Sequence, residues 1–445
     1  MVNSLPWELV PFESLLLEPL RNGIYKKKEF HGRGCKIVNM GELFSYPRLN
    51  SSIDMNRVEL TEKEKNKSLL LSGDLIFARR SLTAEGAGKC SLIRYVNEDT
   101  TFESSIIRAR LEPKKADPEF YYYLFNSPVG KWLLGTILRQ TAVSGITGGD
   151  LAKLVVPKPS LAIQKIIAQH CRSLDDKTEL NNQINQTLEQ MAQTLFKSWF
   201  VDFDPVKAKM NGEQPKGMDA ITAPLFPEKL VESELGLIPE GWDIASIKDF
   251  GSVVCGKTPS KKNADFYGGD VPFIKIPDTH GKVFITETTD TLTQAGDESQ
   301  PKKRIPENSI CVSCIATVGQ VFITTKPGHT NQQINSLVPY DQNSLYYLLF
   351  KFKGLNKHFH DLASGGSATL NMNTSTFSKV ALVRPTADLL EAFHKTVGGL
   401  MEKMLANQLE NATLSELRDT LLPKLLSGEI DLENLQVEQA IAIAE

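Results

Sequence analysis

One short segment of the chain matches a pattern that binds nucleotide phosphates. Residues 251–258 read GSVVCGKT, which fits the P-loop spacing of a glycine, four residues and then Gly-Lys-Thr. In a P-loop, backbone amides and a helix N-terminus surround the phosphates, so a buried strand must precede the loop and a helix must follow it. Here residues 243–249 (DIASIKD) are polar, and residues 259–265 (PSKKNAD) offer no apolar face for a helix. A P-loop NTPase is therefore a disfavoured alternative.

Cys311 and Cys314 have the spacing of a pair of zinc ligands. Neither a second cysteine pair nor a nearby histidine completes a set of four ligands. The pair lies in a strand-like run, where alternation places the two side chains on opposite faces. We expect both cysteines to be core residues and predict no metal site.

The residues that a DNA-modifying or DNA-cleaving enzyme would need are not apparent. An amino-methyltransferase holds its flipped base with an Asn/Asp-Pro-Pro-aromatic motif and binds its methyl donor with a glycine-rich loop. Residues 202–205 (DFDP) contain a single proline, and no nuclease carboxylate cluster stands out. We predict no catalytic residues, and a binding protein is favoured over an enzyme.

Length and composition set the frame for these segments. A chain of 445 residues fits two or three domains. It has no long apolar stretch, no signal-peptide pattern and six scattered cysteines, so we expect a reducing, cytoplasmic location. Residues 1–160 and 237–385 carry net charges of +5 and +2, whereas residues 161–236 and 386–445 carry −3 and −7. Local positive charge is what phosphate contacts require.

The chain repeats itself once. Residues 151–159 (LAKLVVPKP) match residues 377–385 (FSKVALVRP) at an offset of 226. Each is interpreted as a short apolar strand that ends in proline. Residues 121–125 answer residues 346–350 at an offset of 225, and Pro6-Trp7 answers Gly241-Trp242 at an offset of 235. The drift indicates loops of different length in two related halves.

A helical period follows each proline-terminated strand, with Ser160 and Thr386 as candidate N-caps. The residues seven apart in each segment form the expected seam of a coiled coil. They are Ile167, Leu174, Asn181, Leu188 and Leu195 in the first segment, and Phe393, Leu400, Asn407, Leu414 and Leu421 in the second. We expect an antiparallel pair of helices roughly 55–60 Å long. An asparagine at the same point of each seam can fix the register. Two ordinary amphipathic helices, each in its own domain, remain the alternative.

These patterns predict a mixed α/β protein with a pseudo-two-fold internal repeat. Two globular domains, residues 1–160 and 237–385, would be separated by the helices, residues 161–200 and 386–445. Residues 201–236 are rich in Gly and Pro and are predicted to be a linker.

Several segments together resemble the specificity subunits of type I restriction–modification systems. Residues 234–242 (ELGLIPEGW) and 256–260 (GKTPS) resemble the entry to a target-recognition domain. Residues 199–205 (WFVDFDP) resemble the end of the central conserved helix, and residues 417–430 (LRDTLLPKLLSGEI) resemble the distal conserved segment. Residues 331–333 (NQQ) and 366–371 (GSATLN) also fit the second recognition domain.

The resemblance implies a non-catalytic, cytoplasmic subunit that reads a bipartite, asymmetric DNA site, with the two conserved helices acting as a ruler. It further implies two methyltransferase subunits and motor-nuclease restriction subunits as partners. S-adenosylmethionine, ATP and Mg would belong to those partners, and no cofactor is expected in this chain.

Loop residues that can reach phosphates or base edges are the candidate DNA contacts, because Arg can read guanine and Asn or Gln can read adenine. In the first half they are Arg79, Arg80, Arg139, Gln140, Thr141 and Ser144. In the second half they are Lys257, Thr258, Ser260, Lys261, Lys262, Ser367, Thr369 and Asn371. A stand-alone DNA-binding or scaffold protein without a methyltransferase partner remains the second hypothesis.

Overall fold

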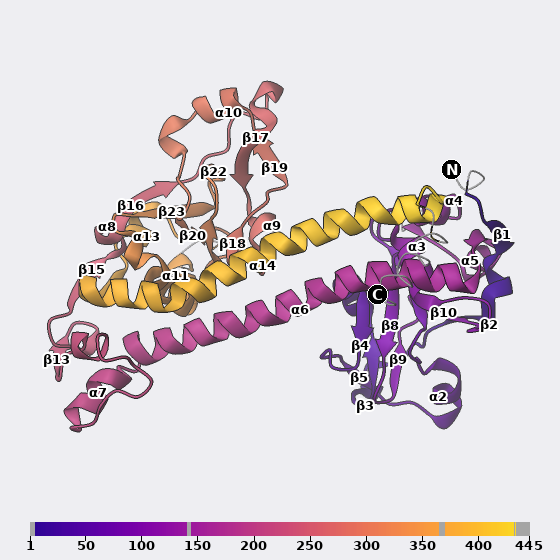
Figure 1. The fold of residues 1–445 in the computed structure, drawn as a ribbon, viewed down its shortest axis with the longest axis horizontal. Helices are drawn as coiled ribbons and strands as arrows, with labels where there is room; N and C mark the ends of the chain where they lie inside the picture. The colour runs from indigo at the N-terminus through magenta and orange to yellow at the C-terminus, as the bar shows by residue number, and fades with distance from the viewer. Residues whose placement is uncertain (1–4, 140–143, 365–369, 431, 433–445) are drawn as a thin grey trace, which may run out of the picture. The chain divides into compact units, whose positions relative to one another are not determined.

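The computed structural model describes residues 5–139, 144–364, 370–430 and 432 (Figure 1). The chain forms two compact units. Unit 1 consists of residues 1–179 and 411–445, and unit 2 consists of residues 180–410. Each unit contains one α/β domain and part of each of two long helices, α6 (Leu161–Phe200) and α14 (Ala387–Ser427). The mixed α/β class and the two long helices are confirmed.

Among the described residues, the domain of unit 1 is built on four mixed or antiparallel sheets. The strands of its five-stranded sheet are, in spatial order, β2 (Leu16–Asn22), β10 (Ile106–Leu111), β6 (Leu75–Ala78), β8 (Cys90–Tyr95) and β4 (Arg48–Asn50). A three-stranded sheet has β5 (Arg57–Val58), β3 (His31–Val38) and β9 (Thr100–Phe102), and β1 (Glu8–Pro11) pairs with β12 (Val155–Lys158). A short pair joins β7 (Arg80–Ser81) to β11 (Ser144–Gly145). The helices are α1 (Met40–Ser45), α2 (Glu62–Ser68), α3 (Pro118–Asn126), α4 (Pro128–Thr136) and α5 (Gly148–Lys153), with 3-10 turns η2 (Phe12–Leu15) and η3 (Lys28–Phe30).

The domain of unit 2 has the corresponding sheets. Its five-stranded sheet has the order β16 (Gly251–Cys255), β23 (Ile334–Pro339), β20 (Ile310–Ser313), β21 (Val321–Thr324) and β18 (Phe284–Ile285). The three-stranded sheet has β19 (Asp290–Leu292), β17 (Tyr267–Ile274) and β22 (His329–Thr330), and β15 (Asp243–Ser246) pairs with β24 (Ala381–Arg384). The helices are α8 (Ile247–Phe250), α9 (Ile276–Thr279), α10 (Gln294–Glu298), α11 (Leu345–Gly354), α12 (Asn356–Ala363) and α13 (Thr374–Ser378), with 3-10 turns η5 (Ala264–Phe266), η6 (Pro301–Lys303) and η7 (Gln342–Ser344).

The internal repeat is confirmed at the level of topology. Both five-stranded sheets have the same order and end in a parallel pair, β4 with β8 and β18 with β21. Tyr121 donates a hydrogen bond to the carbonyl of Pro157 at 3.1 Å, and Tyr347 donates one to the carbonyl of Val383. These bonds align Tyr121 with Tyr347, at an offset of 226 like the strands, rather than with Tyr346 as the aligned letters suggest.

The repeated segments that end in proline are only partly strands. In each, a short helix (α5 or α13) comes first and the strand (β12 or β24) forms only the last four residues. Thr147 caps α5 and Asn373 caps α13 through side-chain oxygens that accept backbone N–H bonds. The local capping signal therefore prevails over the apolar run that predicted a longer strand.

The two long helices run antiparallel. Arg418 pairs with Asp175 in unit 1, while in unit 2 Asn407 donates to Asn185 at 2.9 Å and the rings of Phe200 and Phe393 lie 4.9 Å apart. Residues with higher numbers on α6 thus contact residues with lower numbers on α14. Helix α6 begins directly after Ser160, whose hydroxyl accepts a bond from Ile163 N–H at 3.4 Å.

The segment predicted as a linker carries structure of its own. It contains α7 (Asp204–Met210), η4 (Ala223–Leu225) and the hairpin of β13 (Leu230–Ser233) and β14 (Gly236–Pro239). Val206 and Phe226 are buried in the core of unit 2, where Phe226 packs edge-on against Trp199. Apolar anchors therefore order a stretch whose Gly and Pro content predicted an irregular chain.

Within the described residues, no helix is both long and apolar enough to cross a membrane.

Candidate nucleic-acid interface

One edge of the five-stranded sheet in unit 1 gathers several of the candidate residues. Strand β2 ends at Asn22, opposite Ile107, and Ile106 pairs with the last residue of β6, Ala78. The loops that follow β2 and β6 and the loop that precedes β10 therefore meet at this edge. Arg79 N–H donates to the carbonyl of Ser105 at 2.8 Å, which fixes the second loop against the third.

The candidate residues of the first domain differ in their exposure and in the partners that they already have. Arg80 is exposed on β7, which pairs with β11 and so lies beside Ser144. Arg79 is half-buried and its guanidinium reaches the carbonyl of Ser104. Arg139 is already paired with Asp150, with Nε–Oδ2 at 2.9 Å, so this arginine forms an ion pair within its own domain. Gln140 and Thr141 lie outside the described residues.

The corresponding edge of unit 2 carries residues 256–260 in a fixed loop. Gly256 N–H donates to the carbonyl of Ile334 at 3.0 Å, and Lys257 N–H donates to the carbonyl of Thr330 at 2.9 Å. A β-carbon at Gly256 would lie 2.1 Å from the carbonyl oxygen of Asn331, so only glycine fits this approach. Tyr267 donates its hydroxyl to the carbonyl of Pro259 at 2.8 Å.

A buried polar cluster supports this loop from below. The amide of Gln300 donates to the carbonyl of Lys257 at 2.8 Å and lies 3.4 Å from Nδ1 of His329. His329 is fully buried, and its Nε2 lies 2.7 Å from Oδ1 of Asp297. The loop backbone is thus held by buried side chains, whereas the side chain of Lys257 itself is exposed.

The exposed side chains of the loop are basic and polar. Lys257, Ser260, Lys261 and Lys262 are exposed, and within the described part of the chain none of these lysines forms an ion pair. Thr258 donates to the amide oxygen of Gln332 at 2.6 Å. Sequence reasoning did not select Gln332 as a contact, although the NQQ segment was noted. Its position depends on a pairing with a residue 74 positions away, which no local pattern reveals.

Asn371 is also exposed at this edge, where it forms a bridge with Ile315. Met372 N–H donates to the carbonyl of Cys314, and Cys314 N–H donates to the carbonyl of Gln333. The chain before α13 is therefore joined to the same edge as Gln332. Ser367 and Thr369 lie outside the described residues.

The geometry argues against a P-loop at residues 251–258. Residues Gly251–Cys255 are strand β16, whose backbone pairs with β23, so these amides do not surround a cavity. The next helical element is the three-residue turn η5, which cannot supply a helix N-terminus of the kind that binds phosphate. The Gly-Lys-Thr letters here are explained by the close approach of Gly256, the exposed side chain of Lys257 and the hydrogen bond from Thr258 to Gln332.

Cys311 and Cys314 face different cores, as strand alternation predicts. Cys311 packs with Ile274 and Phe322, and Cys314 packs in the main core of unit 2. Burial raises the pKa of each thiol to about 12, so both are neutral thiols at physiological pH.

The predicted seam residues of the helices differ in burial. Ile167, Asn181, Phe393 and Asn407 are buried, and the other six are partly buried: Leu174, Leu188, Leu195, Leu400, Leu414 and Leu421. In unit 2, Asn181 donates to Glu410 at 2.8 Å, and Asn185 donates to the carbonyl of Met404 at 3.1 Å. The asparagines thus form a polar layer, which favours one register of the helix pair because a shift would leave buried amides unbonded.

At the two sheet edges, exposed lysine and arginine stand beside fixed amide and hydroxyl groups. Cations of this kind bind phosphates, and amides bind base edges.

The model of the type I restriction modification DNA specificity domain matches residues 22–190 and 239–395, one match in each half of the chain.

Two relatives match over more than two thirds of the chain. It is 42% identical over 441 residues to the specificity subunit of the type I restriction enzyme HindI of Haemophilus influenzae, covering 88% of this chain and 94% of that protein. It is 26% identical over 323 residues to the specificity subunit of the type I restriction enzyme MjaIX of Methanocaldococcus jannaschii, covering 71% of this chain and 70% of that protein. The crystal structure of a type I restriction–modification system S subunit from M. genitalium matches with a TM-score of 0.53 at 16% identity, covering 95% of this chain and 96% of that one, which shows a shared fold.

Proposed function

This chain belongs to the type I restriction–modification DNA specificity family, and we propose on that premise that it reads a bipartite, asymmetric DNA site without catalysing a reaction itself. The observation that carries this proposal is the duplicated sheet edge. Both domains present cationic and polar loop residues at the same end of the same five-stranded sheet. A protein with two related binding edges suits the local two-fold symmetry of a DNA duplex.

The two edges differ in their side chains, which supports two different half-sites. In unit 1 the groups at the edge include the exposed Arg80 and the half-buried Ser144, whereas in unit 2 they include the exposed Lys257, Gln332 and Asn371. Arginine pairs best with guanine, and asparagine or glutamine with adenine. Unlike contacts at the two edges would select unlike bases, so the complete site would not be a palindrome.

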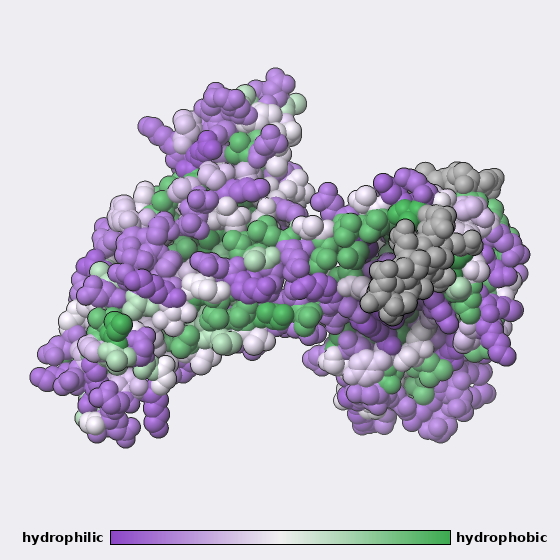
Figure 2. Space-filling view, in the orientation of Figure 1, coloured by the Kyte–Doolittle hydropathy of each residue, from purple (hydrophilic) through white to green (hydrophobic). Residues whose placement is uncertain are grey.

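We further propose that methyltransferase subunits bind the helix pair and that restriction subunits join through them. Both long helices expose large apolar side chains, Leu180 and Met191 on α6 and Leu409 and Leu417 on α14, and hydrophobic residues are visible along these helices in Figure 2. Such side chains favour burial against a protein partner. S-adenosylmethionine, ATP and Mg would then act in the partner subunits, and the helix pair would serve as the ruler between the half-sites.

The test is an exchange of domains within the assembled complex. Residues 1–150 are replaced by those of a relative with a different target, and methylated positions are mapped across the host genome. We expect one half-site to change and the other to stay the same. The reciprocal exchange of residues 237–385 serves as the matched control and should change only the other half-site. A change of both half-sites in either chimera would contradict two independent reading domains.

A further inference from the structure

The loop after β16 has a structural counterpart in the first domain, although the first half contains no Gly-Lys-Thr-Pro segment. Gly23 N–H donates to the carbonyl of Ile106 at 3.1 Å, and Ile24 N–H donates to the carbonyl of Phe102 at 2.9 Å. These two bonds repeat the pair that Gly256 and Lys257 make in the second domain. A β-carbon at Gly23 would lie 2.2 Å from the carbonyl oxygens of Phe102 and Glu103, so the same close approach requires glycine here.

The far end of each loop is also marked by a shared segment. Residues 29–32 (EFHG) and 265–268 (DFYG) each lie at the end of a 3-10 turn and the start of the next strand, β3 or β17. Gly32 and Gly268 both have positive φ angles, +95° and +88°. Between the two anchors, residues 24–28 (IYKKK) in the first domain correspond to residues 257–264 (KTPSKKNA) in the second. The two loops differ in length and in sequence, so their correspondence is not evident from the sequence alone.

The loop of residues 24–28 is basic, and it carries one exposed aromatic side chain. Tyr25 is 81% exposed, and Lys27 and Lys28 are exposed as well. Neither of these two lysines has an ion-pair partner among the residues that the structure describes. Lys26 is different, because its ammonium donates to Glu64 at 2.8 Å and lies 4.9 Å from the centre of the Phe30 ring.

Lys26 is thus an internal anchor, and the loop is held along its length. The hydrogen bond from Lys26, with further bonds from Thr61, lowers the pKa of Glu64 to about 2, so the pair persists at neutral pH. Phe30 N–H donates to the carbonyl of Lys27 at 3.0 Å, and Glu59 N–H donates to the carbonyl of Phe30 at 2.8 Å. A loop fixed in this way loses little conformational freedom when it binds a ligand.

The loop also lies at the edge that carries the arginines of the first domain. Ile24 bridges to Glu103, and the adjoining Ser104 and Ser105 carbonyls contact Arg79. Lys27, Lys28 and Arg80 therefore add positive charge to one end of the same sheet.

We propose that residues 24–28 form a DNA-binding loop of the first domain, in which Lys27 and Lys28 bind phosphates and Tyr25 contacts the bases or sugars of the half-site. This inference rests on the proposed function, because it assumes that the sheet edge faces the duplex. It assigns to the first domain the element that residues 257–262 would supply in the second.

The experiment measures equilibrium binding of the complex with methyltransferase subunits to a labelled duplex, by fluorescence anisotropy over a range of salt concentrations. The duplex carries the site found methylated in the host. For Lys27→Ala with Lys28→Ala we expect the slope of log K against log salt to become shallower by about 1.8, since each phosphate contact contributes about 0.9. For Tyr25→Ala we expect about tenfold weaker binding to the specific duplex and a smaller loss on a scrambled one, as for loss of one base contact.

Two control variants separate the possible failures. Lys114→Ala removes an exposed lysine just after the other end of β10 and should leave the slope unchanged. Lys257→Ala should make the slope shallower by about 0.9. If the double variant keeps the wild-type slope while Lys257→Ala makes the slope shallower, the loop assignment is wrong and the proposed function stands. If the unaltered complex binds its site no better than the scrambled duplex, the proposed function itself fails. Thermal melting of each variant excludes loss of folding as the cause.

Discussion

The two units attach their domains to the same pair of helices by different interactions. In unit 1 an ionic network adds to the apolar contacts that both helices make with the domain core. Tyr123 and Arg418 both donate to Asp175, at 2.9 and 2.7 Å, and Arg94 makes a bidentate pair with Asp176 at 2.7 and 3.0 Å. Arg48 also reaches Asp176, at 2.8 Å. These bonds join the domain and both helices in one network.

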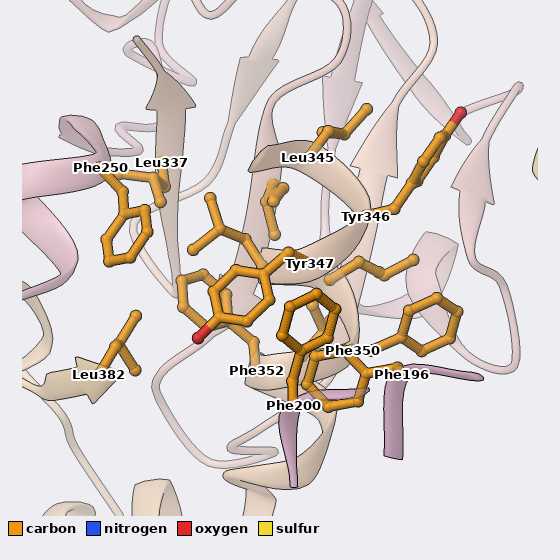
Figure 3. Close-up of a cluster of buried hydrophobic side chains, with 14 of the residues drawn as sticks. Phe196, Phe200, Phe250, Leu337, Leu345, Tyr346, Tyr347, Phe350, Phe352 and Leu382 are labelled. Carbon is orange, nitrogen blue, oxygen red and sulfur yellow. The ribbon is translucent and has the colours of Figure 1, made fainter. Parts of the chain in front are cut away.

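In unit 2 the attachment is mainly aromatic, although Lys353 of α11 also pairs with Glu189 of α6. Figure 3 shows Phe196 and Phe200 of α6 beside Tyr347 and Phe350 of α11. The ring of Phe200 lies 5.0 Å from that of Tyr347 and 4.9 Å from that of Phe393 on α14. Such edge-to-face contacts add to the free energy gained by removing the rings from water.

The repeat allows the two attachments to be compared position by position. At the offset of 226, Tyr123, Asp175 and Arg418 correspond to Leu349, Met401 and Ala192, all of which are buried. One backbone arrangement thus tolerates two kinds of contact chemistry at equivalent sites. The ionic version requires every partner to be present, because an isolated buried charge is costly, whereas the apolar version in unit 2 depends on filled volume.

The largest effect is expected from a cavity in the aromatic attachment. Phe200→Ala should lower the free energy of unfolding of unit 2 by about 3–5 kcal/mol, since the side chain is 3% exposed and packed on several sides. Urea titration followed by hydrogen exchange in residues 192–200 measures this loss. The control Met191→Ala, at a side chain 49% exposed on the same helix, should change stability by less than about 0.5 kcal/mol. Equal losses for the two variants would mean that the aromatic cluster does not hold the domain.

A smaller effect is expected when the ionic attachment is broken. Arg418→Ala should lower the free energy of unfolding by about 3 kcal/mol, the low end for a broken buried pair. In the intact pair the Arg418 side chain is 30% exposed and the Asp175 side chain is 12% exposed. Hydrogen exchange in residues 165–179 provides the measurement. The triple variant Tyr123→Leu, Asp175→Met and Arg418→Ala, which copies the residues of unit 2, should recover more than half of the loss. If the triple variant is less stable than the single one, the two attachments are not interchangeable.

The smallest effect concerns pH. Burial of Asp176 opposes its ionisation, but hydrogen bonds from Arg94 and Arg48 outweigh it and lower its pKa. A carboxyl with a lowered folded pKa stabilises the fold above its unfolded value of about 3.9 and loses that contribution as pH falls through the folded pKa. Below about pH 4 we expect unit 1 to lose up to roughly 1 kcal/mol. Exchange rates corrected for intrinsic pH dependence would show it in residues 165–179. Asp176→Asn should abolish this part of the pH dependence, and an unchanged profile would remove Asp176 from the network.

The sequence predicted the repeated parts of the fold well, because those parts follow local rules. The seven-residue spacing in the two long segments predicted α6 and α14, and the strand-like run at Cys311 predicted the buried strand β20. Residues 201–236 were predicted to be a linker from their Gly and Pro content, which does not reveal the burial of Val206 and Phe226 in the core of unit 2 because that burial is a tertiary effect.

The candidate site was less predictable. Lys257 and Thr258 were selected because their segment resembles a known motif. Arg139 was selected on charge alone, and its pairing with Asp150 depends on how the loop closes. The loop of residues 24–28 was missed because its likeness to the second loop lies in backbone hydrogen bonds and two glycines rather than in shared side chains. A sequence motif identifies similar residues, but the equivalence of two diverged loops is recognised only from the register of the strands that flank them.

The two units are distributed differently along the chain. Unit 2 is a continuous stretch, residues 180–410, but unit 1 needs both ends of the chain, and Leu422, Leu425 and Leu426 are part of its core. A nascent chain leaving the ribosome can therefore finish the second domain while the first still exposes apolar surface. The part translated first is completed last, when the indole of Trp7 bonds to the carbonyl of Leu426. A prematurely terminated chain would lack this closure, and proteases could remove it before it joins an assembly.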